Sequence, residues 1–279
     1  MKIAVLMVGN VRTWEKTKKT FYKFFSGVSI DIYIDTYDTK YLYHPAIAPT
    51  GHDREEPIIN EKELREQFAG LNVKFCRLRN TSVALGFDRA MLGDKFKESH
   101  SNLLLPISHA LDTLEVIKEY EEDSASSYSL IIRTRFDILY RGHVKKMFQL
   151  YECENFLFHP LGNIVPNDWL FASRLDSMIE LYSCALNELR ACEIEGSEVD
   201  PPHGLFKVIG EKIGLKLKGL DIAMGLLRSD GTIYAYVPPS NKLYQFILSR
   251  FVRIKNYAIR KCIRKRWTGF VRQCAGKDN

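Results

Sequence analysis

Residues 128–137 read YSLIIRTRFD, and this stretch decides what kind of fold the chain can form. Its first half is a continuous apolar run, which is typical of a strand buried on both faces of a parallel sheet. We therefore predict a central strand over 128–132. Its second half carries two arginines and an aspartate, and charged side chains at the end of a buried strand are normally paired or bound to a metal.

Segments on both sides of this strand complete an α/β pattern. Apolar or alternating runs predict strands at 2–8, 30–35, 73–76, 155–158 and 168–172, and short strands within 215–236. Helical spacing predicts helices at 12–25, 60–68, 103–121 and 175–192, with another beginning near 202, and 80–101 is expected to be an irregular loop. We expect a mostly parallel sheet flanked by helices, with a crevice at the strand ends.

Composition fits a globular enzyme-sized chain of 279 residues, 46% hydrophobic and 12% aromatic. No run approaches the ~18 apolar residues that span a bilayer, and the apolar start at 2–8 is too short for a secretion signal. The six cysteines form no CxxC pair, so we expect free thiols and a cytoplasmic protein.

Positive charge is concentrated at the C-terminus. Residues 250–279 carry ten Lys or Arg and one acid, a local charge of +9 that leaves −3 for residues 1–249. We divide the chain into a catalytic domain, 1–240, and a basic helical tail, 241–279. The helix expected at 245–272 suits adsorption to an anionic membrane face, and it equally suits packing on the body with a solvated basic face. Nucleic-acid binding has less support, because no aromatics are interleaved as a stacking platform.

The loop after the first strand reads GNVRT, residues 9–13. Gly9 permits a tight exit, and the exposed amides of Asn10 and Thr13 with the cation of Arg12 suit a nucleotide base or diphosphate. It is neither a P-loop nor a GxGxxG fingerprint. The alternative is an ordinary strand-to-helix turn in which Thr13 caps the helix.

Carboxylates near strand ends are the other candidates. Asp137 is placed to bind Mg²⁺ or Mn²⁺, and the alternative is an ion pair with Arg135, which we expect on the same side of the strand. Asp168, in a Pro/Asn loop, suits a general base on an acceptor hydroxyl, although an aspartate in a turn is common. Asp35 could contact a ribose or uracil; most of the acids at 31, 35 and 38 are expected to be solvated.

Four motifs in order, KIAVLMVGNVRTW, DIYIDTYD, SLIIRTRFDILY and NDWLFAS, resemble small glycosyltransferases of bacterial polysaccharide clusters and of large algal viruses such as the chloroviruses. The similarity covers roughly residues 1–225. It implies a GT-A-like (Rossmann-like) fold that binds a nucleotide sugar. Asp137 stands where such enzymes have the metal-binding DxD carboxylate, with Gly9, Asn10 and Arg12 against the nucleotide and Asp168 facing the acceptor.

Two positions depart from that pattern. Arg135 occupies the first position of the DxD, and a single carboxylate makes a weaker metal site. His203 stands where a Pro-Glu element often precedes a helix; contact with phosphate or acceptor is one interpretation and a surface histidine the other.

The leading hypothesis is transfer of a hexosyl or pentosyl group from a UDP-sugar to a glycan or lipid-linked acceptor hydroxyl, assisted by Mn²⁺ or Mg²⁺ and by Arg133 and Arg135. In the inverting form Asp168 deprotonates the acceptor; a retaining mechanism would not need that base, and the sequence leaves both open. The rival is a non-catalytic binding module associated with membrane or nucleic acid. A nucleotidyltransferase is a weaker alternative, since no phosphate loop of that type is present.

Overall fold

Continuous apolar runs form the middle of the sheet, as their composition predicts. The computed structural model describes residues 2–11, 13–38, 59–80, 98–145, 156–160, 170–195, 202–220, 222–227 and 233–237. Strands β1 (Ile3–Val8) and β4 (Leu130–Thr134) are buried at every position and pair with each other in parallel. Because both faces of these strands are covered by helices, alternation with polar residues is not needed.

The described strands form an α/β fold with one large, mostly parallel sheet. Seven strands lie in the order β3-β2-β1-β4-β7-β6-β8. The other strands of this sheet are β2 (Ile30–Tyr37), β3 (Asn72–Arg79), β7 (Leu170–Ser173), β6 (Phe156–Pro160) and β8 (Lys216–Leu220). Strand β7 is antiparallel to both of its neighbours, and the other described pairs in this sheet are parallel.

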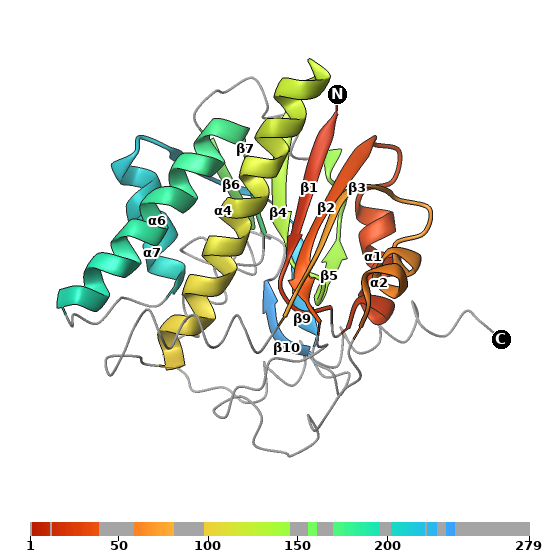
Figure 1. Cartoon of the computed structure of the whole chain (residues 1–279), viewed down its shortest axis with the longest axis horizontal. Coiled ribbons are helices and arrows are strands. Elements are labelled where there is room, and N and C mark those ends of the chain that lie inside the picture. Colours follow the sequence, from red (N-terminus) through yellow and green to blue (C-terminus); the bar gives the residue numbers. More distant parts are fainter. Residues whose placement is uncertain are drawn as a thin grey trace, which may run out of the picture.

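Helices cover the sheet on both faces (Figure 1). Helices α1 (Trp14–Phe24) and α2 (Glu61–Gln67) lie on one face, where Trp14 stacks on Phe68 at 4.3 Å between ring centroids. Helices α4 (Glu98–Ser124), α6 (Leu175–Glu195) and α7 (Pro202–Lys212) lie on the other. Each face therefore has its own hydrophobic cluster, one around Phe21 and Ile132 and one around Leu114 and Ile131.

A second, three-stranded sheet lies at the carboxyl ends of the parallel strands (Figure 1). It consists of β5 (Ile138–Arg141), β9 (Ala223–Leu227) and β10 (Ile233–Val237), all antiparallel in the order β10-β9-β5. Because β5 begins only a short turn after β4 ends, this small sheet is attached directly to the end of the central strand.

Three sequence-based expectations need correction. The central strand ends at Thr134 and not at 132, so Arg133 lies inside the sheet. Helix α4 begins at Glu98, so the end of the loop expected at 80–101 is helical, although 81–97 lie outside the described residues. Asp31 and Asp35 are buried and not solvated, because β2 is paired on both edges and cationic side chains supply their partners.

Other expectations concern features that are only partly described. Cys76 and Cys184 are free thiols. No helix within the described ranges has the length and apolar character needed to cross a membrane. The basic tail, 241–279, lies outside the described residues.

Candidate functional site

The order of the strands marks one edge of the sheet as a place for a ligand. After β1 the chain crosses through α1, on one face, to β2; it reaches β4 from α4, on the opposite face. Strands β1 and β4 are nevertheless neighbours. In open α/β sheets, ligands bind at the point where the strand order reverses, in the crevice outside the carboxyl ends of the two neighbouring strands. Gly9 and Asn10 follow β1 at this edge, and Arg135 and Asp137 follow β4, whose Thr134 is in register with Met7 of β1.

Gly9 ends β1 with a φ of +120°, a conformation that side-chain-bearing residues rarely adopt. Its N–H donates to the carbonyl of Asp35 at 3.3 Å, and its carbonyl accepts from the Thr36 hydroxyl at 2.6 Å. Two buried oxygens follow, Oδ1 of Asn10 and Oγ1 of Thr13, and neither has a hydrogen-bond partner among the described residues. Thr13 stands at the N-cap position of α1, but its side chain makes no capping bond.

Arg133 is the most unusual side chain at this edge. It is 3% exposed, and strand alternation places it on the α4 and α6 face, in register with Leu6 of β1 and Phe171 of β7. Within the described residues, its Nε and Nη1 atoms have no hydrogen-bond partner. A buried cation is normally paired, because removing it from water costs several kcal/mol. Arg133 therefore offers two N–H groups at the place where the topology expects a ligand.

Arg135 and Asp137 form a two-pronged ion pair. Nε of Arg135 lies 2.9 Å from Oδ1 of Asp137, and Nη2 lies 2.9 Å from Oδ2. Asp137 is 1% exposed, whereas the Arg135 side chain is 23% exposed. The pairing that the sequence left open as an alternative is thus present. The two side chains meet through the turn between β4 and β5, and not by strand alternation, because β4 ends at Thr134.

This turn is held from two sides. The Thr17 hydroxyl of α1 donates to the Phe136 carbonyl at 2.6 Å, and the N–H of Leu227 in β9 donates to the Asp137 carbonyl at 2.9 Å. The Phe136 ring packs edge-on against Trp14. The Arg135–Asp137 pair is consequently mounted on a fixed backbone.

A metal centre at Asp137 does not fit this arrangement. Both carboxylate oxygens face the Arg135 guanidinium, and no group of three or more His, Cys, Asp or Glu side chains suited to a metal ion occurs in the described part of the chain. Mg²⁺ and Mn²⁺ favour several oxygen ligands. Metal binding by Asp137 stays a prediction, and a metal ion there would compete with Arg135 for the same two oxygens.

Asp35 lies at the carboxyl end of β2 and is fully buried. Nε and Nη2 of Arg79 each donate to it at 2.7 Å, and the Thr113 hydroxyl donates at 3.2 Å. Nη2 of Arg79 also donates to Asp112 of α4 at 2.7 Å. Burial raises the pKa of Asp35, and the hydrogen bonds and charge of Arg79 oppose this shift. The predicted contact of Asp35 with a nucleotide is untested; in this arrangement its oxygens serve to orient Arg79.

Sequence reasoning missed the arginines of β3 and their helix partners. Arg77 and Arg79 are two apart at the end of a strand beside β2, which is a signal for two cations on one face. His109 of α4 lies beneath them, 4% exposed, with Nδ1 3.2 Å from the Tyr37 hydroxyl. Burial and then the charges of Arg79 and Arg77 lower the pKa of His109 to about 3.

Three predicted site residues are not placed by the structure. Arg12 and Asp168 lie outside the described residues. His203 is in the first turn of α7, but its side chain is not described. The other predicted residues lie at or just after the carboxyl ends of the neighbouring strands β1 and β4, with Asp35 on β2. The set at β1 and β4 is Gly9, Asn10, Thr13, Arg133, Arg135 and Asp137.

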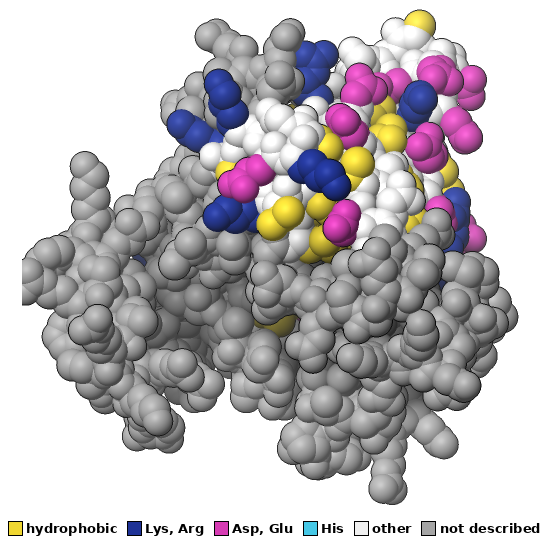
Figure 2. Space-filling model, turned by 90° about the vertical axis from the view of Figure 1, so that its left-hand side faces the viewer, with side chains coloured by type: hydrophobic (Ala, Val, Ile, Leu, Met, Phe, Trp, Pro, Cys, Tyr) yellow, Lys and Arg dark blue, Asp and Glu magenta, His cyan; other side chains and the backbone are white. Residues whose placement is uncertain are grey.

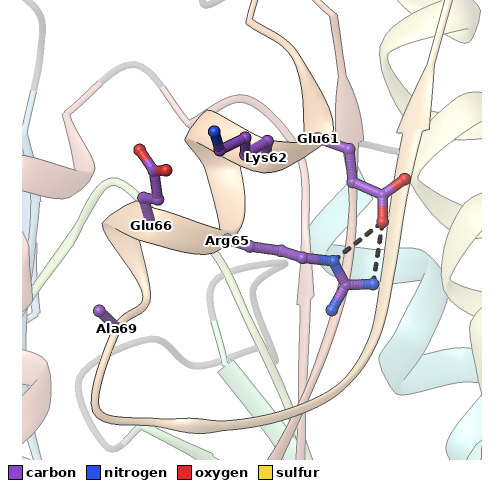
Figure 3. Close-up of a pocket in the computed structure, with 5 residues that line it drawn as sticks. All are labelled: Glu61, Lys62, Arg65, Glu66 and Ala69. Atoms are coloured by element: carbon purple, nitrogen blue, oxygen red, sulfur yellow. Dashed lines mark hydrogen bonds and ion pairs between the residues drawn. The ribbon is translucent and has the colours of Figure 1, made fainter.

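A shallow pocket elsewhere on the surface is not part of this edge. It is lined by Glu61, Lys62, Arg65, Glu66 and Ala69, all on or just after α2. Figure 3 shows Arg65 turned toward Glu61, with which it forms an ion pair at 2.9 Å. The charges in the pocket are exposed and partly satisfied by one another, so we assign no function to it.

Charged side chains on the face shown in Figure 2 are mixed in sign. Lys and Arg side chains are interspersed with Asp and Glu side chains over the described part of that face. This distribution differs from the clustered basic stripe that is the usual electrostatic footprint of nucleic-acid binding.

Searches of protein-family models and of curated proteins found no match to this chain. The resemblance to small glycosyltransferases thus stays a prediction. A functional proposal for this chain has to rest on the geometry of the β1–β4 edge.

Proposed function

We propose that this chain is a GT-A-like glycosyltransferase that takes a sugar from a nucleotide donor, UDP in the leading form, and transfers it to a hydroxyl of a glycan or lipid-linked acceptor. The observation that carries the proposal is the Arg133 guanidinium, enclosed at the β1–β4 edge with two N–H groups that no described residue uses. Guanidinium N–H groups bind phosphate oxygens through charge-assisted hydrogen bonds.

The unpartnered atoms at this edge favour a nucleotide over a simple anion. Phosphate oxygens can only accept from Arg133, whereas Oδ1 of Asn10 needs a ligand that donates. Oγ1 of Thr13 can do either. A nucleoside diphosphate supplies both kinds of group: acceptors on its phosphates, and donors on its base N–H and ribose hydroxyls.

The chemistry needs a base and a means of stabilising the leaving group. The bond between the anomeric carbon and the diphosphate oxygen breaks, and the departing diphosphate gains negative charge that Arg133 and Arg135 are placed to offset. The acceptor oxygen bonds to the anomeric carbon, and its proton passes to Asp168, the proposed general base, with inversion. Asp137 keeps Arg135 in position, and no step in this scheme passes through a metal.

The fold is compatible with this proposal. A mostly parallel sheet with one reversed strand, β7, and a small sheet attached to the end of β4 frame the edge where donor and acceptor would meet. We further propose that the enzyme works in the cytoplasm and that its basic tail, 241–279, adsorbs to an anionic membrane that carries the acceptor.

Thermal melting of the full-length protein with nucleotides tests the proposal. We expect UDP and UDP-sugars to raise the melting temperature more than inorganic phosphate, because only the nucleotides supply donors for Asn10. The active donor should then release UDP slowly by hydrolysis. Equal response to phosphate, or no response to any nucleotide together with salt-sensitive retention on anionic liposomes or DNA, would favour the non-catalytic binding module instead.

A further inference from the structure

We propose that two guanidinium groups, those of Arg133 and Arg135, take the place of a divalent metal ion in binding the donor diphosphate, and that donor binding is independent of metal. The inference rests on the proposed function and deepens it by assigning the diphosphate subsite. Asp137 is then a positioning residue for Arg135 and not a metal ligand.

Asp137 is already paired with a cation. It is 1% exposed, and both of its oxygens accept from Arg135 at 2.9 Å. A metal ion at these oxygens would have to compete with the guanidinium, because each oxygen already accepts a hydrogen bond from Arg135. The backbone of the turn is anchored by Thr17 and Leu227, so the main chain that carries Asp137 is held in place beside Arg135.

Two arginines supply positive charge at this edge. Arg133 and Arg135 are two residues apart, and together they carry the charge of one divalent ion. Arg133 is 3% exposed, and its Nε and Nη1 atoms have no partner among the described residues. A bound anion would supply the hydrogen-bond acceptors that this buried cation lacks. Arg135 is tied to Asp137 by Nε and Nη2, and its side chain is 23% exposed, so solvent reaches it while it keeps this ion pair.

The shape of a guanidinium also suits a diphosphate. A guanidinium presents a planar fork of N–H donors that matches two phosphate oxygens, whereas a lysine presents a point charge. A subsite of two forks requires arginine at both positions. Arg133→Lys should therefore lose affinity although it keeps the charge.

The test is calorimetric titration of UDP into the full-length protein, once in buffer with EDTA and once in buffer with Mn²⁺. We expect the two dissociation constants to agree within about twofold. A twofold change corresponds to about 0.4 kcal/mol, which is less than a metal ion bound to the diphosphate would contribute. Affinity that Mn²⁺ raises more than tenfold, and that Asp137→Asn abolishes, overturns the inference while leaving the proposed function intact. Failure of UDP to bind in either buffer overturns both.

Variants assign the roles. Arg133→Met should weaken UDP binding in EDTA by roughly ten- to a hundredfold, the loss expected for hydrogen bonds to a charged group. Arg65→Met, which removes a cation from the exposed face of α2, is the matched control and should leave the affinity unchanged. A control that loses affinity equally, or an Arg133→Met protein that binds normally, contradicts the assignment.

Asp137 is tested by a double-mutant cycle in the same titration. If Asp137 acts by positioning Arg135, then Asp137→Asn weakens UDP binding in the wild-type background and has no further effect in an Arg135→Met background. Melting curves recorded alongside confirm that each variant is folded. Additive losses would show that Asp137 acts on the ligand independently of Arg135.

Discussion

Arg133→Met should make the unliganded protein more stable, which is the opposite of what most substitutions in a core do. Arg133 is 3% exposed, and two of its N–H groups have no partner among the described residues. A buried, unsatisfied polar group costs about 1–3 kcal/mol. Methionine keeps an unbranched apolar chain against Leu6 and Phe171, removes both donors and removes the charge. We estimate a gain of about 2–3 kcal/mol in the free energy of unfolding.

Differential scanning fluorimetry with and without UDP measures both sides of this prediction. For a chain of this size the gain corresponds to a rise of roughly 4–12 °C in melting temperature without ligand. UDP at a hundred times its wild-type dissociation constant adds about 2.7 kcal/mol to the wild type. Because the variant should bind UDP roughly ten- to a hundredfold more weakly, the same concentration should add only about 0.4–1.4 kcal/mol to it. Arg65→Met should change stability by less than about 0.5 kcal/mol and keep the UDP response. A less stable Arg133→Met protein that keeps the full wild-type response to UDP would refute the reasoning.

Three further outcomes are expected. The pKa of His109 is about 3 in the folded protein against 6.5 for the free side chain. Between pH 6.5 and pH 3 the unfolded chain therefore binds a proton at this residue that the folded chain does not. The free energy of unfolding consequently falls as the pH is lowered from 6.5. Between pH 6.5 and 5, urea unfolding should show that the free energy of unfolding falls by about 1.5 kcal/mol because of this group. His109→Gln should remove this loss. An unchanged pH dependence in that variant would contradict the burial of a neutral His109. Asp168→Asn should lower turnover by about 10²- to 10⁴-fold with the UDP dissociation constant unchanged, and a normal rate would exclude Asp168 as the base. Removal of residues 241–279 should abolish retention on anionic liposomes at low salt while the UDP-induced rise in melting temperature persists, and liposome binding that survives would place the membrane contact elsewhere.

The framework of the fold could be predicted from the sequence because the helices and central strands are strongly patterned. Continuous apolar runs at 2–8 and 128–132, and the alternating run at 30–35, form the three adjacent strands β1, β4 and β2. The reversal of β7 could not be predicted, since Leu170–Ser173 is a short buried run whose direction depends on its connections. The sequence pattern also ends β4 two residues early, because an arginine at 133 normally indicates that a buried strand has reached solvent.

The candidate site was predictable as a location but not as a set of partners. Gly9 and Asp137 both follow apolar runs, and this position identifies them from the sequence. The sequence could not decide whether Arg135 or a metal occupies Asp137, because both outcomes need only a carboxylate at a strand end. Arg79 and Asp112 were missed because they lie 33 residues apart in the chain and meet only when α4 packs on the sheet.

The two buried carboxylates at the strand ends explain why Arg133 stands apart. Asp35 accepts two hydrogen bonds from Arg79, and Asp137 accepts two from Arg135. Each of these two cations therefore has a carboxylate partner. Arg133 lies closer to the middle of the sheet than either, and the described residues give it none. An enclosed cation that has no carboxylate lowers the stability of the empty protein, yet it sets up a strong interaction with an anion that reaches it, because little water remains to compete. The same desolvation that makes Arg133 unfavourable in isolation makes it effective toward a diphosphate, and for this reason substitution of Arg133 should separate stability from ligand binding.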